Sequence, residues 1–203
     1  MQNPRLYITY RSPYGRKVRI AMLEKGFAFD EIVVDLSHRS PEFLALNPTG
    51  TVPTLETTDG LVLTDSTLIL HYLESLTDYP SLLPADARAK WETWNWEELA
   101  DRLCEEQIAI FFEKARPEVD RRPEIITRAE AKSREIMATL LNTLVRHDYL
   151  MDTVTLADIA MSAVCNWMSF RLGKDWSTED PAIDAWLARL NLRESFKNTV
   201  PRL

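Results

Sequence analysis

The hydrophobic pattern of this chain changes abruptly near residue 80, and this change limits the possible folds more than any other feature of the sequence. Before that point, short apolar segments of strand-like and helix-like period alternate, and four of the five glycines lie there. After it, apolar residues recur at helical spacing, and all six tryptophans are found. Two prolines at 79–84 interrupt regular structure between the two regions. We therefore predict a domain at 1–79, a linker at 80–86 and a second domain at 87–203.

The first region is predicted to have the element order βαβαββα. Its strands, indicated by short runs of alternating or continuous apolar residues, are predicted at 6–10, 31–35, 52–56 and 61–63, with the second mostly buried. Ser12–Pro13 and Ser40–Pro41 mark two helix starts, because a serine hydroxyl accepts from free N–H groups and proline fits the first helical position. A third helix is predicted to start at Asp65 or Ser66.

The second region is predicted to be entirely helical. Its helices are predicted at 87–114, 123–147, 159–170 and 181–189, followed by a coil that contains proline. Thr155 and Asp158 have the spacing of a capping box, in which two side chains satisfy the free N–H groups at a helix start. The predicted fold class is therefore an α+β domain followed by an all-α domain.

The charge and composition exclude several classes of function. The chain has 24 basic and 31 acidic residues, a formal net charge of −7, and no basic region, so we predict no nucleic-acid or membrane partner. No apolar run approaches the ~20 residues of a transmembrane helix, and the first residues do not resemble an export signal. The cysteines and histidines lack the spacing of metal ligands, so we predict no metal and a reduced, cytoplasmic protein.

Pro53 is unusual because proline removes a hydrogen-bond donor and is normally kept out of strand interiors. A trans proline on an edge strand is the interpretation that frequency alone favours. The alternative is a cis Val52–Pro53 bond at the start of the strand, which would leave the backbone of Val52 pointing outward and unpaired. Such backbone groups can pair with an extended peptide ligand.

Two of the predicted helix starts add groups that suit a small zwitterionic peptide. Ser12 begins a helix, where free N–H groups and the helix dipole favour an anion. Ser66 can offer a hydroxyl and an N–H group to a carboxylate, and Asp65 can pair with an ammonium group. Each of these residues on its own is more often a structural cap, so only their combination points to a ligand.

Three motifs in this order and spacing resemble the cytosolic glutathione transferase family: Ser12–Arg19 (SPYGRKVR), Asn47–Leu55 (NPTGTVPTL) and Asp65–Ser66. With the capping box, the resemblance extends over nearly the whole chain. It implies a thioredoxin-like domain that binds glutathione, a helical domain that completes a hydrophobic substrate site, and a homodimer. The implied activity is glutathione transfer to a hydrophobic electrophile, a detoxification reaction. A glutathione-dependent isomerase or dehalogenase and a non-catalytic regulatory protein are the alternatives.

The resemblance also assigns roles to individual residues. Ser12 would donate a hydrogen bond to the sulfur of glutathione, and Val52, beside a cis Pro53, would pair with the cysteinyl unit. Asp65 and Ser66 would hold the γ-glutamyl ammonium and carboxylate. Because only a thiolate attacks electrophiles and a free thiol has a pKa of ~8.5, the role of Ser12 would be to stabilise the ionised sulfur.

The glycyl end of glutathione and the sulfur contact leave alternatives open. His38 is the candidate for the glycyl carboxylate, whereas its neighbour Arg39 is predicted to be a solvated surface residue. Tyr7 or Tyr10 could replace Ser12 as the sulfur contact, because the tyrosine-type classes use a residue near the first strand. Ser12 is preferred, and a serine there disfavours the mixed-disulfide chemistry of relatives that have cysteine at this position.

Several polar groups are predicted to have structural roles only. The basic cluster Arg16–Lys17–Arg19 is predicted to be a solvated face, with contact to a partner subunit as the alternative. Cys104 and Cys165 lie within apolar helical stretches and are predicted to be buried packing residues. Glu97 and the acidic residues one and two turns after it are predicted to form a solvated acidic stripe.

Overall fold

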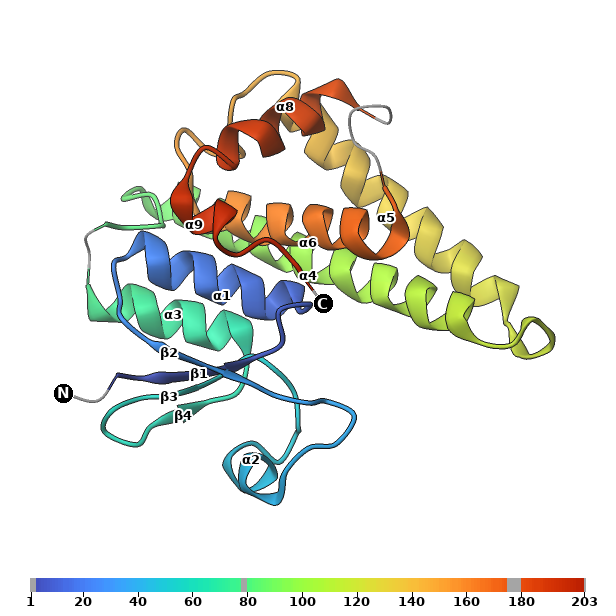
Figure 1. The fold of residues 1–203 in the computed structure, drawn as a ribbon. Helices are drawn as coiled ribbons and strands as arrows, with labels where there is room; N and C mark the ends of the chain where they lie inside the picture. Colours follow the sequence, from blue (N-terminus) through green and yellow to red (C-terminus); the bar gives the residue numbers. More distant parts are fainter. Residues whose placement is uncertain (1–2, 78–79, 175–179, 203) are drawn as a thin grey trace. The chain divides into compact units, whose positions relative to one another are not determined.

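The computed structural model describes residues 3–77, 80–174 and 180–202 (Figure 1). Contacts divide the chain into two units, one comprising Met1–Leu83 and Arg193–Leu203 and the other Pro84–Leu192. The first unit contains a thioredoxin-like four-stranded sheet with helices and the second is helical, which confirms the predicted fold class. The segment Arg193–Leu203 belongs by its contacts to the first unit, whereas the sequence-based boundaries divide the chain linearly and stay a prediction.

The sheet of the first unit has the strand order β2-β1-β3-β4. Its strands are β1 (Arg5–Ile8), β2 (Asp30–Val33), β3 (Thr54–Glu56) and β4 (Val62–Leu63). The alternation in β1 places Leu6 and Ile8 in the core, where both are fully buried. The prediction that the second strand is mostly buried is wrong: β2 pairs only with β1, and this edge position leaves Val33 58% exposed.

The described residues of the first unit also form the helices α1 (Pro13–Glu24), α2 (Pro41–Leu46), α3 (Ser66–Leu76) and α9 (Glu194–Lys197). Helices α1 and α3 lie side by side over one face of the sheet, and α2 lies beyond the other face (Figure 1). The two predicted serine caps are present, since Ser12 and Ser40 each accept from a backbone N–H in the first turn. Helix α9 replaces the predicted coil, because four residues are too few to show a helical period.

The described part of the second unit contains α4 (Ala87–Ala115), a 3₁₀ turn at Glu118–Asp120, α5 (Pro123–Leu144), α6 (Leu156–Leu172) and α8 (Pro181–Leu190). The predicted helices are present and differ from these mainly at their ends, where periodicity is least informative. The capping box of Thr155 and Asp158 is present at the start of α6. No helix in the described part of the chain is both long and apolar enough to span a bilayer.

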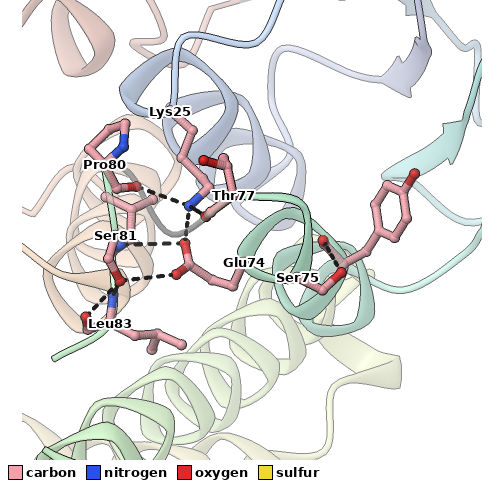
Figure 2. A network of polar contacts seen from close by, with 9 residues as sticks. Lys25, Glu74, Ser75, Thr77, Pro80, Ser81 and Leu83 are labelled. Carbon is pink, nitrogen blue, oxygen red and sulfur yellow. Dashed lines mark hydrogen bonds and ion pairs between the residues drawn. The ribbon is translucent and has the colours of Figure 1, made fainter. Parts of the chain in front are cut away.

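A buried ion pair joins the end of α1 to α3 and to the segment that leaves the first unit (Figure 2). The Lys25 ammonium donates to Glu74 at 2.8 Å and to the carbonyl oxygens of Thr77 and Pro80 at 3.0 Å each. Glu74 also accepts from the backbone N–H of Leu82 at 3.4 Å. All three ammonium hydrogens are therefore used, which is the condition under which a buried lysine is tolerated.

Two predictions about surface charge are wrong. Arg16, Lys17 and Arg19 are 1%, 2% and 5% exposed, so the basic cluster is not a solvated face. Glu97 is 2% exposed and does not belong to a solvated stripe. Helical spacing identifies which residues share a face of a helix. It does not reveal whether another element packs against that face and buries its charged side chains.

Candidate active site in the N-terminal unit

The predicted site residues of the first unit lie in the segments at one end of the strands, and we refer to this end as one edge of the sheet. Strands β1 and β2 are parallel and both end at this edge, while β3 runs antiparallel to β1 and begins there. Strand β4 is antiparallel to β3 and therefore ends there as well. The segments that leave or enter this edge carry Ser12 after β1, His38 and Arg39 after β2, Val52 before β3, and Asp65 and Ser66 after β4.

Ser12 is the N-cap of α1 and is half-buried. Its hydroxyl oxygen accepts from the backbone N–H of Gly15 at 3.0 Å. Because this bond uses the oxygen as an acceptor, the hydroxyl hydrogen remains available for donation to another group. The residue thus offers an O–H donor at the positive end of the helix dipole, an arrangement that favours an anion such as a thiolate.

The Val52–Pro53 peptide bond is cis. The edge-strand explanation for Pro53 is wrong, because β3 lies between β1 and β4 and begins only at Thr54. Proline therefore precedes the ladder and removes no bond from it. Within the described part of the chain the backbone of Val52 has no hydrogen-bond partner, so its N–H and C=O groups can pair with an extended peptide.

Asn47 holds the loop that presents Val52. It is fully buried, and its amide nitrogen donates to the Thr51 carbonyl oxygen and to the Thr54 hydroxyl, each at 2.9 Å. Its amide oxygen accepts from the backbone N–H of Thr49 at 3.0 Å. The sequence predicts that Asn47 and Pro48 end the short helix before them, and α2 does end at Leu46, but the sequence did not indicate that Asn47 holds this loop.

The start of α3 presents a second pair of polar groups. Asp65 is the exposed N-cap, and one of its carboxylate oxygens accepts from the backbone N–H of Leu68 at 3.0 Å. Ser66 is the first residue of α3 and is 3% exposed. A carboxylate oxygen and a serine hydroxyl at a helix start can receive an ammonium group and a carboxylate respectively.

His38 and Arg39 differ in how they are held. The His38 side chain is 88% exposed and lies 3.3 Å from the carboxylate of Asp35. The Arg39 Nε donates to the carbonyl oxygen of Gly50 at 2.7 Å, a contact that the sequence did not indicate. Gly50 has a φ of +64°, and a Cβ there would approach Arg39 to 2.8 Å, so only glycine allows this close contact.

The two tyrosines proposed as alternatives to Ser12 are occupied elsewhere. The Tyr7 hydroxyl donates to Glu56 at 2.9 Å, and the Tyr7 ring packs 5.7 Å from the ring of Phe43 on α2. Burial, followed by the hydrogen bond to Glu56, raises the pKa of Tyr7, which makes it a poorer donor to sulfur. The Tyr10 ring contacts the guanidinium groups of Arg19 at 5.1 Å and Arg202 at 4.1 Å. These contacts favour Ser12.

The helical unit contains a cavity of about 830 Å³, a volume suited to a small organic compound. Its apolar lining residues come from four helices and include Ile110, Phe111, Met137, Met168 and Ile183. Cys104 and Cys165 are fully buried, as predicted, and burial raises the pKa of Cys165 to about 12, which removes it as a nucleophile. The described residues contain no cluster of side chains suited to a metal ion.

Comparisons with known proteins agree with this geometry. The family model described as the N-terminal domain of glutathione S-transferase matches residues 6–81, and the model of the C-terminal domain matches residues 100–194. An uncharacterised GST-like protein, YibF, of Escherichia coli K12 is 32% identical over 195 residues, which cover 95% of this chain and 96% of that protein.

Two solved structures are similar over 98% of this chain. A glutathione S-transferase from Methylobacillus flagellatus KT with glutathione bound is 31% identical, has a TM-score of 0.91 and is covered completely. A glutathione S-transferase from Methylobacterium radiotolerans JCM 2831 in complex with glutathione sulfonate is 32% identical, has a TM-score of 0.92 and is covered to 95%.

Proposed function

This chain belongs to the glutathione S-transferase family, and from that premise we propose that it binds glutathione, ionises its thiol and transfers the sulfur to a hydrophobic electrophile. One observation carries the proposal: the sheet edge that bears the cap of α1 also bears a backbone with free hydrogen-bonding groups and the polar start of α3. These three features match the sulfur, the cysteinyl backbone and the γ-glutamyl end of the tripeptide.

Glutathione would be held along this edge as an extended chain. The N–H and C=O groups of Val52 would pair with the cysteinyl unit, as in an added antiparallel strand. Asp65 would receive the γ-glutamyl ammonium, and the Ser66 hydroxyl and N–H would receive its carboxylate. For the glycyl carboxylate we propose Arg39 in place of His38, because Arg39 is anchored to Gly50 beside the Val52 loop.

Ser12 would act as a hydrogen-bond donor to the sulfur and not as a nucleophile. A free thiol with a pKa of ~8.5 is only roughly 3% ionised at pH 7. The Ser12 hydroxyl and the N-terminus of α1 would lower that pKa by ~2 units, which corresponds to about 2.7 kcal/mol. Ionisation can then raise the rate by at most ~25-fold at pH 7, so the rest of the acceleration comes from positioning the electrophile.

The other features of the proposed enzyme follow from the family. The solved relatives with bound glutathione and glutathione sulfonate support glutathione as the co-substrate. We propose that the protein is a cytoplasmic homodimer with a role in detoxification, and light scattering at micromolar concentration is expected to give twice the mass of the chain. The apolar cavity of the helical unit supports a hydrophobic second substrate.

Replacement of Ser12 tests the proposal. Ser12→Ala is expected to lower the rate of glutathione conjugation at pH 7 by about 3–10-fold, because the thiolate loses its hydroxyl donor while the N-terminus of α1 remains. Retention of the variant on immobilised glutathione is expected to persist, since the other contacts remain. A panel of aryl halides, epoxides, isothiocyanates and unsaturated carbonyls would supply the electrophile.

Ser40→Ala is the matched control. Ser40 caps α2 with the same Ser–Pro pair, and its hydroxyl accepts from Phe43 N–H at 3.2 Å, but it has no proposed contact with sulfur. The control is expected to retain the wild-type rate. Equal rates for Ser12→Ala and the wild type would overturn the role of Ser12. A folded protein that neither binds glutathione nor turns over any electrophile would favour the regulatory alternative.

A further inference from the structure

The C-terminal segment, Arg193–Leu203, belongs to the first unit and follows helix α1 from its end toward its start (Figure 1). Arg193, which begins the segment, donates through Nε to Glu24, the last residue of α1, at 2.9 Å. Three residues later, the carbonyl oxygen of Phe196 accepts from Nη2 of Arg16, in the first half of α1, at 3.3 Å. Contacts farther along the segment are therefore made nearer to the start of the helix.

The described part of this segment ends beside the turn that leads into α1. The backbone N–H of Ser12 donates to the carbonyl oxygen of Thr9 at 3.1 Å and closes a turn with Tyr10 in its middle. The guanidinium carbon of Arg202 lies 4.1 Å from the centre of the Tyr10 ring. The Cα atoms of Tyr10 and Ser12 are at most about 7 Å apart, because only two residue steps separate them. Arg202 therefore lies close to the start of α1, where the sulfur of glutathione is proposed to bind.

Two of the arginines at this turn have no carboxylate partner in the described part of the chain. Arg11, the residue before the cap of α1, and Arg202 are both exposed and form no ion pair there. Arg19 also lies near the Tyr10 ring, at 5.1 Å, but its charge is balanced by Glu31 at 2.6 Å. The turn therefore carries an excess of positive charge, which favours an anionic group on a molecule that binds there.

Glutathione itself does not need this charge. Its γ-glutamyl carboxylate is proposed to bind at Ser66 and its glycyl carboxylate at Arg39, and neither residue belongs to α1 or to the turn before it. The remaining reactant is the electrophile, which must lie against the sulfur at Ser12 in order to react. A guanidinium that lies over an aromatic ring can still donate from its edge to both oxygens of a carboxylate.

We propose that Arg202 makes the enzyme selective for electrophiles that carry a carboxylate. The electrophile would present its reacting carbon to the sulfur at Ser12 and its carboxylate to Arg202, which the Tyr10 ring supports. With an aryl chloride, the thiolate forms a bond to the ring carbon, and chloride leaves with the electrons of the broken carbon–chlorine bond. The thiol proton passes to water before this step. The inference rests on the proposed function, because it requires the sulfur of glutathione to lie at Ser12.

Two aryl chlorides that differ in one carboxylate test this selectivity: a neutral chlorodinitrobenzene and the corresponding chlorodinitrobenzoate. The value of kcat/KM for each is measured at saturating glutathione. Arg202→Met is expected to lower kcat/KM about tenfold for the benzoate, because a charge-assisted hydrogen bond is lost, and to leave the value for the neutral compound within about twofold. For the benzoate, Arg202→Lys keeps the charge and is expected to lose less than Arg202→Met, whereas Arg202→Glu is expected to lose more.

Lys197→Met is the matched control. Lys197 is an exposed cation of the same segment, but it lies on α9 and pairs with Glu194 at 2.9 Å. This variant is expected to leave the ratio of the two kcat/KM values unchanged. Because the ratio compares two substrates of one variant, any change in the folded fraction of that variant cancels from it.

The possible failures are distinguishable. The inference about Arg202 is wrong, and the proposed function stands, if the wild type conjugates only the neutral compound. The same holds if the ratio of the two kcat/KM values is unchanged in Arg202→Met or changes equally in Lys197→Met. An increase in the KM for glutathione with both compounds in Arg202→Met would also overturn the inference, because Arg202 would then bind glutathione. If the wild type conjugates neither compound nor any other electrophile, the proposed function itself fails.

Discussion

Asp158 shows how a single residue can organise a unit of the structure. Its carboxylate is fully buried and accepts from the backbone N–H of Leu150 at 3.0 Å, from that of Thr155 at 3.2 Å and from Trp186 Nε1 at 2.9 Å. It thus joins the loop before α6, the start of α6 and helix α8. Burial raises the pKa of Asp158 above its ordinary value even though these hydrogen bonds lower it, so the bonds offset only part of the cost of burying the charge.

Asp158→Ala is therefore expected to destabilise the protein by about 3 kcal/mol or more, because it leaves several buried donors without an acceptor. Trp186→Phe removes only one of these donors but also leaves a small cavity, because Trp186 is fully buried, so its expected cost is about 2 kcal/mol. Urea unfolding measures both free energies. A smaller loss for Asp158→Ala than for Trp186→Phe would show that the network does not depend on the carboxylate.

Single residues also show what the sequence could and could not predict. The caps Ser12 and Ser40 were predicted at the correct positions, and Asp65 is one of the two positions predicted for the third helix start, because capping depends on residues three apart in the chain. The burial of Arg16 and the anchoring of Arg39 on Gly50 were not predicted. Both depend on contacts between segments distant in sequence, and composition and periodicity carry no information about such contacts.

Helix α1 is the element on which the candidate site depends, and its two ends are held differently. The first turn carries Ser12, whereas Glu24 near the last turn accepts from Arg193 and Ser195 of the C-terminal segment. Burial raises the pKa of Glu24, but the hydrogen bonds from Arg193 and Ser195 and the charge of Arg193 outweigh it and leave that pKa below its ordinary value. The attachment of α9 to α1 is therefore strongest when Glu24 is ionised.

This shift predicts a pH-dependent contribution to stability. A carboxyl group with a lowered pKa in the folded state stabilises it above the unfolded pKa of ~4.3, and the contribution is lost as the pH falls through the folded value. The difference in unfolding free energy between the wild type and Glu24→Gln is expected to be largest near pH 6 and to shrink in acid. Urea unfolding at several pH values measures it, and a difference independent of pH would contradict this account of Glu24.

The sequence predicted which segments are helices or strands more completely than it predicted whether those segments are buried or exposed. Strong periodicity and capping signals identified α1, α3 and the long helices of the second unit. The exposure of β2 was missed, because a run of apolar residues looks the same in an edge strand as in a central one. Helix α9 was missed because it is too short to produce a period.

At the scale of the whole molecule, the chain returns to its first unit at its end. Residues Arg193–Leu203 group with the sheet, so the first unit consists of two segments distant in sequence. A linear reading of the hydrophobic pattern cannot detect such a return, because the pattern records neighbours along the chain and not in space. The family match, by contrast, was apparent from three motifs, since their combination and spacing are far more specific than any one of them.

The proposed catalysis depends on the ionisation of glutathione at the start of α1. The most direct test titrates the thiolate absorbance of glutathione bound to the wild-type protein, after binding has been established by calorimetry. We predict a thiol pKa about two units below the ~8.5 of a free thiol. Bound glutathione whose thiol titrates at the free value would contradict the account.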